Sequence, residues 1–362
     1  MGSDFRERRK IRVLVGEDSP LMRRIIVDAL SEEEDIEVVG AVPDGREVLK
    51  KAVGLKPDCI TLDLEMPHMD GIETLRYLMG EWPTPVVIVS AHSNKGAETT
   101  IKCLEYGAVD FVPKGKAGTS FPVAELIRKV HVAATVDAKK LHYFPPDRSL
   151  VTKKRQVKET FIKKLVIIGA STGGPNALAE IMQRLDPSIP AGVLIAQHMP
   201  PNFTRYLAER LDDRSRFDIA EAVQEDVIEA GKALVAPGGM HIFVEERIGT
   251  PIVVLLPKNE TTRSSSPSID FAFSSAARVL GNRVIGVVLT GMGTDGLAGS
   301  IAIKRAGGVV ISQDESTSVV YGMPGAVARE GVSDAIVPIG RIADEIEKLV
   351  VEPATVESVD EH

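Results

Sequence analysis

The chain has 362 residues, of which 44% are hydrophobic, 26% charged and 4% aromatic, so it is long enough for two domains with mainly aliphatic cores. Its formal net charge of −8 argues against a general affinity for nucleic acid, and no apolar run approaches the roughly 20 residues that span a bilayer. The charged N-terminus does not fit a signal peptide, and two cysteines, Cys59 and Cys103, cannot make a disulfide framework. We therefore expect a soluble cytoplasmic protein with two buried free thiols and no direct membrane insertion.

Residues 1–128 form the first predicted domain, in which short β-branched runs alternate with amphipathic helical segments. The predicted strands are 11–15, 38–42, 59–62, 86–89 and 111–112, and the predicted helices are 21–30, 46–53, 71–79, 97–106 and 123–132. Strands that alternate with helices favour a parallel sheet covered on both faces. The pattern predicts an α/β, flavodoxin-like doubly wound fold.

Residues 129–160 are predicted to be a linker. They contain eight basic and three acidic residues, and Pro145-Pro146 interrupts the middle of the segment. The fifth helix of the first domain is expected to run into its start. The charge fits either solvated side chains or a basic strap that contacts an acidic surface.

Residues 161–350 form a second α/β unit. Its alternating strands are predicted at 165–169, 193–196, 284–289, 309–311 and 335–337, and its helices at 175–185, 202–211, 268–280, 297–306, 325–329 and 341–350. Between 218 and 257 three strands, 233–236, 241–245 and 252–256, follow one another without helices, and the turns at 237–239 and 248–250 suggest hairpins. The pattern predicts a second doubly wound domain whose sheet is mostly parallel with an antiparallel hairpin edge. The acidic segment 351–362 is expected to fray.

Polar side chains gather at the ends of the first domain's strands. Glu17 and Asp18 follow the first strand, Asp63 ends the third, Ser90 ends the fourth and Lys114 follows the fifth. The carboxyl ends of parallel strands share one edge, where ligands bind. Crowded carboxylates suit Mg²⁺, and a carboxylate beside that cation can accept a phosphoryl group. Each acid alone could instead be a helix cap or a solvated loop residue.

The first strand of the second domain runs into the glycine-rich turn 169–175, which carries Ser171. A dinucleotide-binding turn is disfavoured, because Ser171 stands where the second glycine of that motif belongs. A serine at a strand-to-helix turn can act as a nucleophile beside backbone N–H groups, although Ser171 alone could also be a plain N-cap. His198 ends the next strand, and Asp295 lies in a glycine-rich loop after another strand, so all three reach one edge. His241 is the rival base, ranked second because it begins a hairpin strand.

The first domain resembles the two-component receiver domain. The motifs are GEDSP (16–20), LDLEMPHMDG (62–71), SA (90–91) and FVPKG (111–115). The resemblance implies that Asp63 is the phospho-acceptor, and that Glu17, Asp18, Asp63 and the backbone carbonyl of Glu65 bind Mg²⁺. It also implies that Ser90 and Phe111 are the switch pair and Lys114 the site lysine. One departure is Gly115, where receivers often have proline after a cis bond, so a cis bond is not expected there.

The second domain resembles the chemotaxis protein-glutamate methylesterase (CheB) family. The motifs are GASTGGP, AQHMPPNFT, LTGMGTDG and QDESTSVVYGMPGAV. The resemblance implies a Ser171, His198 and Asp295 triad, with the Met292 backbone N–H serving the oxyanion and Thr172 nearby. The family usually has His and Arg before its Pro-Ser-x-Asp motif, whereas residues 263–270 have serines there.

The resemblance implies a phosphorylation-activated serine hydrolase. Its reaction would be demethylation of glutamyl methyl esters, and deamidation of glutamines, on methyl-accepting chemoreceptors. A histidine kinase of the chemotaxis pathway would be the phosphodonor, and the esterase reaction would need no cofactor. The alternative is a response regulator with a non-catalytic binding output domain, although the −8 charge and the lack of a helix-turn-helix pattern disfavour DNA.

The same resemblance implies that the unphosphorylated receiver covers the esterase cleft. We expect the contact on the fourth helix, fifth strand and fifth helix of the first domain, because Ser90 and Phe111 transmit changes at Asp63 to that face. Phe121 and Leu126 are the candidate apolar contacts. Both could instead simply pack the fifth helix onto the sheet.

Overall fold

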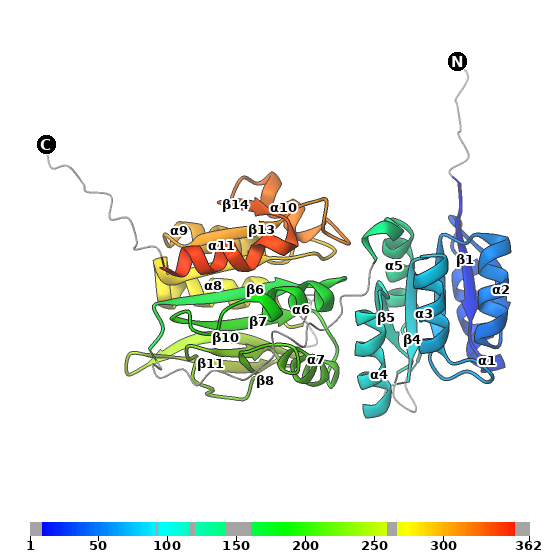
Figure 1. The fold of residues 1–362 in the computed structure, drawn as a ribbon, viewed down its shortest axis with the longest axis horizontal. Coiled ribbons are helices and arrows are strands. Elements are labelled where there is room, and N and C mark those ends of the chain that lie inside the picture. The colour runs from blue at the N-terminus through cyan, green and yellow to red at the C-terminus, as the bar shows by residue number, and fades with distance from the viewer. Residues whose placement is uncertain (1–8, 92, 116–119, 142–160, 259–265, 352–362) are drawn as a thin grey trace, which may run out of the picture.

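The structure, a computed structural model, describes residues 9–91, 93–115, 120–141, 161–258 and 266–351. These ranges hold a five-stranded sheet, a seven-stranded sheet and a separate two-stranded sheet. Helices cover the two larger sheets, and the two units lie side by side (Figure 1). None of the helices in the described ranges is long and apolar enough to cross a membrane.

The first unit has the sheet order β2-β1-β3-β4-β5 with parallel pairing throughout. Its strands are β1 (Ile11–Gly16), β2 (Ile36–Val42), β3 (Cys59–Asp63), β4 (Val86–Ser90) and β5 (Asp110–Pro113). Its helices are α1 (Pro20–Ser31), α2 (Gly45–Leu55), α3 (Gly71–Glu81), α4 (Asn94–Glu105) and α5 (Val123–Ala134). Helix α1 packs on α5, while α3 lies between α2 and α4, so the sheet is covered on both faces. This order is the flavodoxin-like one, as predicted.

Short polar residues start four of these helices. The side chains of Ser19, Asp44, Asp70 and Ser93 each accept a backbone N–H from the first turn of α1, α2, α3 and α4. Such caps satisfy amide groups that a helix leaves without partners. These caps fix where each of the four helices begins after the loop that follows its strand.

The second unit has the sheet order β14-β13-β12-β6-β7-β9-β8, and all its pairs are parallel. Its strands are β6 (Lys164–Ala170), β7 (Ala191–Gln197), β8 (Asp218–Glu221), β9 (Lys232–Val235), β12 (Val284–Val288), β13 (Val309–Gln313) and β14 (Ala335–Val337). Its helices are α6 (Gly174–Arg184), α7 (Phe203–Asp212), α8 (Ile269–Leu280), α9 (Leu297–Arg305), α10 (Met323–Arg329) and α11 (Ile339–Val351), with a short 3₁₀ turn η2 (Gly281–Arg283). Another 3₁₀ turn, η1 (Ala138–Lys140), follows α5 and precedes this unit. The chain order reverses between β6 and β12, and such a switch point is where ligands bind in open α/β sheets.

The antiparallel hairpin predicted between 218 and 257 is present as β10 (Met240–Arg247) and β11 (Thr250–Pro257). Ile248 and Gly249 join the strands with φ values of 52° and 76°, the left-handed backbone of a tight hairpin turn. The hairpin forms a sheet of its own, covered by α8, and the seven-stranded sheet ends instead in β8, which the sequence did not predict. The expected hairpin at 237–239 was wrong, because β9 lies between β7 and β8 and pairs in parallel with both, while β10 pairs with β11.

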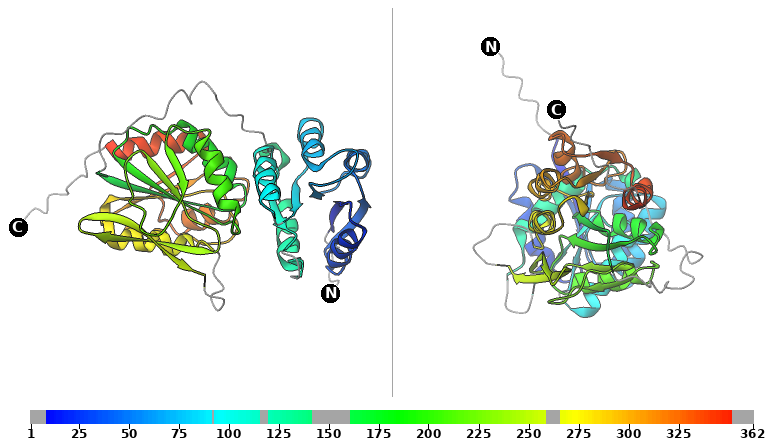
Figure 2. Two further views of the ribbon diagram at one scale, coloured as in Figure 1. Left: turned by 90° about the horizontal axis from the view of Figure 1, so that it is seen from below. Right: turned by 90° about the vertical axis from the view of Figure 1, so that its left-hand side faces the viewer.

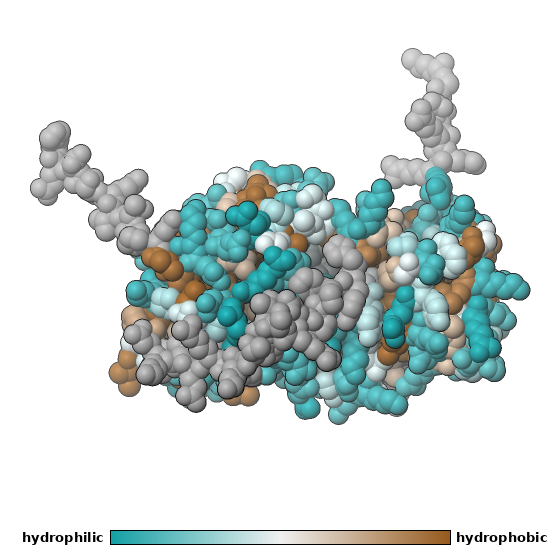
Figure 3. Space-filling model, viewed as in Figure 1, coloured by the Kyte–Doolittle hydropathy of each residue, from teal (hydrophilic) through white to brown (hydrophobic). Residues whose placement is uncertain are grey.

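The cores are mainly aliphatic, as the low aromatic content indicates. Every residue of β3, β4 and β12 is buried. Phe203, Phe217 and Phe273 are the largest fully buried side chains, and both cysteines are buried free thiols, as predicted. The face in Figure 3 is mostly hydrophilic with scattered hydrophobic patches, which is ordinary for a protein surface.

The two units meet through one side of the first sheet. Strand β5 and helices α4 and α5 lie toward the second unit, and α4 packs on α6 and α7 (Figures 1 and 2). This contact uses the three elements expected from the sequence. Helix α4, strand β5 and helix α5 therefore stand between the acidic edge of the first sheet and the second unit.

Candidate active site

Ser171 lies at the turn between β6 and α6, at the switch point of the seven-stranded sheet. Gly173 has a φ of 78°, in the left-handed region that favours glycine, and Pro175 stands near the start of α6. The Ser171 N–H donates to the Thr290 carbonyl at 3.1 Å, and the Ser171 carbonyl accepts from Gly174 at 2.8 Å. These backbone bonds hold Ser171 half-buried at the carboxyl edge of the sheet.

His198 and Asp295 form a hydrogen-bonded line with Ser171. His198 directly follows β7, and Asp295 lies in the loop between β12 and α9. His198 Nδ1 is 3.2 Å from Ser171 Oγ, and His198 Nε2 is 2.7 Å from Asp295 Oδ2. A neutral imidazole carries one N–H, so Nε2 donates it to Asp295 and the bare Nδ1 faces the serine. The structure thus brings the three predicted positions together.

Asp295 is surrounded by donors. Its Oδ2 accepts the Ile269 N–H at 2.9 Å, and its Oδ1 accepts the Asp270 N–H at 2.9 Å. Burial alone would raise the pKa of Asp295, but the His198 hydrogen bond and these backbone bonds outweigh burial and lower the pKa. Asp295 therefore stays ionised beside the imidazole.

The Pro-Ser-x-Asp segment supplies this support. Ser268 caps α8 and also donates to Asp295 Oδ1 at 3.3 Å. Asp270 Oδ1 in turn accepts the N–H groups of Gly296 and Gly299 at 2.9 and 2.8 Å, at the start of α9. Asp295 thus caps α8 while Asp270 caps α9, a reciprocal arrangement that fixes the loop between β12 and α9. Sequence reasoning left Ser268 and Asp270 without a role, although their motif marked the segment.

His241, the rival base, does not contact Ser171. It is buried on β10, and its Nδ1 accepts the Ser268 N–H at 3.2 Å. Burial and the nearby Lys258 lower the pKa of His241, which keeps the imidazole neutral. His198 is therefore the histidine that the structure places beside the serine.

The two residues expected near the oxyanion touch the first unit. Thr172 is buried, and its Oγ1 donates to Asp110 Oδ2 at 2.5 Å. Met292 is 37% exposed, and its Sδ accepts a hydrogen bond from Arg128 of α5 at 3.2 Å. No described residue accepts the Met292 N–H, so this group is available to a ligand.

A cleft of about 610 Å³ lies at Ser171 and His198 and is lined from both units. The second unit contributes the residues around its carboxyl edge, together with Lys258 and Met292. The first unit contributes Asp110, Glu125, Arg128 and Lys129. Access to Ser171 therefore depends on where the first unit sits.

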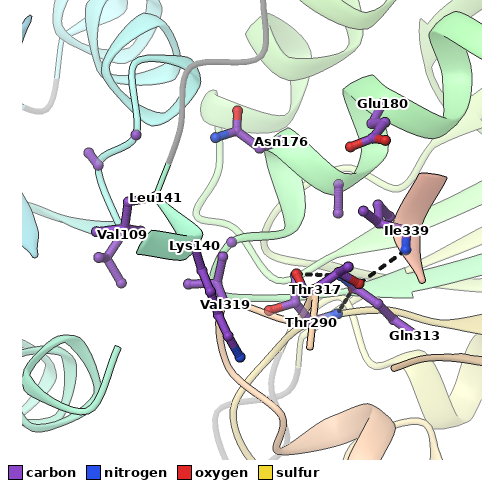
Figure 4. A pocket seen from close by; sticks show the side chains of 14 residues that line it. Val109, Lys140, Leu141, Asn176, Glu180, Thr290, Gln313, Thr317, Val319 and Ile339 are labelled. Carbon is purple, nitrogen blue, oxygen red and sulfur yellow. Dashed lines mark hydrogen bonds between the residues drawn. The ribbon is translucent and has the colours of Figure 1, made fainter. Parts of the chain in front are cut away.

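A much smaller cavity of about 50 Å³ is also lined by residues of both units (Figure 4). Lys140 follows α5 in the chain. Its ammonium group donates to the carbonyls of Glu315 and Ser318 at 2.7 and 3.0 Å. On the far side of the cavity, Gln313 Oε1 accepts the Thr290 N–H at 2.8 Å. This cavity is a packing gap beside an interdomain anchor and is too small to be the substrate site.

The acidic edge of the five-stranded sheet brings Glu17, Asp18 and Asp63 together, with their oxygens within 4.8 Å of one another. Lys114 Nζ lies 2.8 Å from Asp63 Oδ2 and 3.0 Å from Glu17 Oε2. Asp18 is exposed, and Ser19 rather than Asp18 caps α1. The Glu65 N–H points at Asp63 Oδ1 at 3.4 Å, while the metal-binding role of its carbonyl remains a prediction.

The charge at this edge favours a divalent cation. Burial and then the repulsion from Asp63 raise the pKa of Glu17 to about 7, although Lys114 opposes the rise. Burial also raises the pKa of Asp63. Lys114 pairs with Glu17 and Asp63, and Asp18 offers a further oxygen beside them. Once all three acids are ionised, one ammonium group does not balance their charge, and a divalent cation bound to their oxygens would, so the residues fit Mg²⁺.

The predicted switch residues have different surroundings. Ser90 is buried at the end of β4. Phe111 is buried in β5, and its ring stacks on Phe203 of α7 with centroids 4.4 Å apart. Leu126 is fully buried in the core of the first unit, and Phe121 packs against the same core. The apolar contact between the units that was predicted for these two residues is made instead by Phe111. As expected for Gly115, the described residues show no cis bond there.

A buried ion cluster also joins the two units. Glu105, at the end of α4, accepts from Arg210 at 3.1 and 2.8 Å and lies 2.7 Å from an Arg214 nitrogen. Asn176 of α6 donates to the Leu104 carbonyl at 2.9 Å. Sequence reasoning missed this cluster, although a glutamate four residues after Ile101 on the apolar face of a predicted helix was a usable signal.

Fold and site together define the class: a receiver-type α/β unit joined to a parallel α/β unit that carries a Ser–His–Asp arrangement at its carboxyl edge. A family model described as CheB methylesterase matches residues 166–346, and one described as the response regulator receiver domain matches residues 13–121. The chain belongs to the CheB methylesterase family.

Similar proteins agree along almost the whole chain. A Pyrococcus abyssi protein named protein-glutamate methylesterase/protein-glutamine glutaminase is 42% identical, over 94% of this chain and 94% of its own. A Symbiobacterium thermophilum protein of the same name is 43% identical, over 95% of this chain and 98% of its own. The crystal structure of the Thermotoga maritima CheB methylesterase catalytic domain matches with a TM-score of 0.50 and 38% identity, covering 51% of this chain and 98% of that one. These matches favour an enzyme over a non-catalytic output domain.

Proposed function

We propose that this protein hydrolyses glutamyl methyl esters on methyl-accepting chemoreceptors, deamidates glutamines there, and is activated by phosphorylation of Asp63. The observation that carries the proposal is the hydrogen-bonded line from Ser171 through His198 to Asp295. It lies at the sheet's switch point in a chain 42% identical to a named methylesterase. The proposed reaction uses protein side chains and backbone N–H groups and would need no cofactor.

In the proposed mechanism, Ser171 Oγ attacks the ester carbonyl carbon while its proton passes to His198 Nδ1. Asp295 accepts the Nε2–H and stabilises the imidazolium that results. The Met292 N–H, and Thr172 once Asp110 releases it, would bind the developing oxyanion.

The intermediate collapses when its C–O bond to methoxide breaks and Nδ1 returns the proton, so methanol leaves. Water then attacks the acyl-enzyme carbonyl with the same base, and the bond to Ser171 Oγ breaks, which leaves a glutamate side chain on the receptor and regenerates Ser171. With glutamine as the substrate, ammonia leaves in place of methanol.

The proposed control is coverage of this cleft by the receiver. Three contacts from β5 and α5 of the first unit reach residues at or beside the cleft. Asp110 accepts a hydrogen bond from Thr172, and Arg128 donates one to Met292. Phe111 stacks on Phe203. Glu17, Asp18, Asp63 and the Glu65 carbonyl would hold Mg²⁺, which when bound neutralises phosphoryl oxygens. A histidine kinase of the chemotaxis pathway would supply the phosphoryl group in the cytoplasm, and DNA is not a partner.

The test is methanol release from methylated receptor membranes, with and without a small-molecule phosphodonor, combined with labelling of Ser171 by a fluorophosphonate. We expect labelling of the wild type, none of Ser171→Ala, and faster release and labelling with phosphodonor. A wild-type protein that resists the probe and releases no methanol in either condition would exclude the serine mechanism.

A further inference from the structure

Gln197 is a buried side chain that the mechanism above does not use. It is the last residue of β7, pairs with Ala170 of β6, and is 2% exposed. Its Nε2 donates to the Ser171 carbonyl at 2.9 Å and to the His198 carbonyl at 3.0 Å. A single amide group therefore bridges the backbone of the residue that attacks and the backbone of the residue that takes its proton.

The surrounding backbone is built to admit this amide. A Cβ atom on Gly174 would lie 2.0 Å from Gln197 Oε1, so only glycine leaves room there. Reversing the amide would set Oε1 against two carbonyl oxygens, so the bridge forms in one orientation only. The Ser171 carbonyl also accepts the Gly174 N–H at 2.8 Å, which ties the bridge to the start of α6.

The other bonds to this pair of residues come from elsewhere. The Ser171 N–H is held by Thr290 of the loop after β12, and the His198 N–H donates to the Ala170 carbonyl. Gln197 is the only described side chain that bonds the backbone of both residues. Without Gln197 the two segments would still be joined by the bond from the His198 N–H to the Ala170 carbonyl, but the carbonyl groups of Ser171 and His198 would lose their shared donor. Ser171 Oγ and His198 Nδ1 are already 3.2 Å apart, so a small further displacement would weaken proton transfer between them.

We propose that Gln197 is a positioning residue of the hydrolase reaction. By bonding the carbonyl groups of Ser171 and His198, it holds the nucleophile at hydrogen-bond distance from its base. The inference rests on the proposed function, because it assumes that Ser171 and His198 react together. It predicts an effect on the chemical step and not on substrate binding, since Gln197 is buried behind the cleft.

The main test compares Gln197→Met with Gln183→Met in the full-length protein with phosphodonor present. Methionine keeps the volume but removes both donors, and Gln183 of α6 is a similarly buried glutamine, 5% exposed, with no hydrogen bond to the triad. For Gln197→Met we expect kcat to fall about 100-fold with KM within about twofold, because a displacement of about 1 Å costs on that order. The fluorophosphonate labelling rate should fall in parallel, whereas Gln183→Met should keep both rates within about twofold.

Gln197→Glu gives a graded readout that a packing role would not produce. When protonated, the carboxyl group offers one O–H donor in place of two N–H donors, and when ionised it offers none. Its activity relative to the wild type should therefore lie above that of the methionine variant at low pH and fall as the pH rises. If Gln197→Met does not fold, as judged by circular dichroism, the pH dependence of Gln197→Glu decides the matter.

A kcat for Gln197→Met within threefold of the wild type would overturn the proposal, and so would a Gln197→Glu to wild-type ratio that does not change with pH. Failure of the proposed function looks different, because the wild type itself would then release no methanol. Provided the probe still labels Ser171, its labelling rate would continue to test the positioning role of Gln197.

Discussion

Replacing Glu105 by glutamine should open the cleft without touching the triad or the phospho-acceptor. Glu105 is 6% exposed, and its carboxylate faces the guanidinium groups of Arg210 and Arg214 across the junction. Glutamine keeps the shape but removes the charge. When the first unit covers the cleft (the closed arrangement), two guanidinium groups then lie beside a neutral amide. When the first unit moves away (the open arrangement), water can solvate the two guanidinium groups.

The size of the effect follows from burial. Breaking a fully buried ion pair costs roughly 3–5 kcal/mol. Arg210 is 28% exposed and Arg214 4% exposed, so water recovers part of that cost and we take about 2 kcal/mol. This corresponds to a shift of roughly 30-fold in the closing equilibrium. Basal methanol release should rise by up to that factor, with the rate of the separate catalytic unit, residues 161–351, as its ceiling.

The assay is methanol release without phosphodonor, together with the labelling rate of Ser171. Asp28→Asn is the matched control, because it removes an exposed ion pair with Arg24 on α1, far from the junction, and should change neither rate. The separate catalytic unit is a realistic reference, since the corresponding Thermotoga maritima domain was crystallised by itself. If that unit is faster than the whole chain and Glu105→Gln is not, the ion cluster does not hold the two units together.

Three further outcomes are expected. Ser171→Ala should lower methanol release by about 10⁴–10⁶-fold with an unchanged circular dichroism spectrum, and activity within tenfold of the wild type would contradict the mechanism. Asp63→Asn should keep the basal rate but lose the response to phosphodonor, and a response equal to that of the wild type would place the phosphorylation elsewhere. Burial and the repulsion from Asp63 raise the pKa of Glu17 to about 7, so Glu17 holds a proton below that pH and must lose it to Mg²⁺. Mg²⁺ affinity, measured by calorimetry in buffers of different ionisation enthalpy, should therefore fall as the pH drops below about 7 with net proton release, and a constant affinity would contradict the raised pKa.

The parts of this molecule that depend on local pattern could be predicted from the sequence. Strand-and-helix alternation led to both parallel sheets, and the rule that parallel strands share a carboxyl edge brought Ser171, His198 and Asp295 together. The four-residue strand β8 was missed, because its sequence, Asp-Ile-Ala-Glu, offers little apolar alternation. The separate hairpin sheet was not predicted either, because strand pairing depends on tertiary neighbours and not on the strands alone.

Other features depend on side-chain rotation or on residues far apart in the chain. Nothing in the sequence says which imidazole nitrogen of His198 faces the serine, because that depends on ring rotation set by Asp295. The junction pairs Glu105 with Arg210, two residues whose charges carry no mark of their partner. The bond from Thr172 to Asp110 likewise needs both units placed in space before it can be recognised.

The shared lining of the large cleft has a thermodynamic consequence. Arg128 and Asp110 line the cleft beside Ser171, in the space that a bound substrate or inhibitor would need. If phosphorylation at Asp63 favours the open arrangement, occupancy of the cleft must favour it by the same free energy, because coupling between two sites is reciprocal. A protein whose serine carries a phosphonate should thus retain its acyl-phosphate as a larger fraction at equilibrium with phosphodonor. The receptor substrate would then act as an effector of the receiver as well as the molecule it modifies.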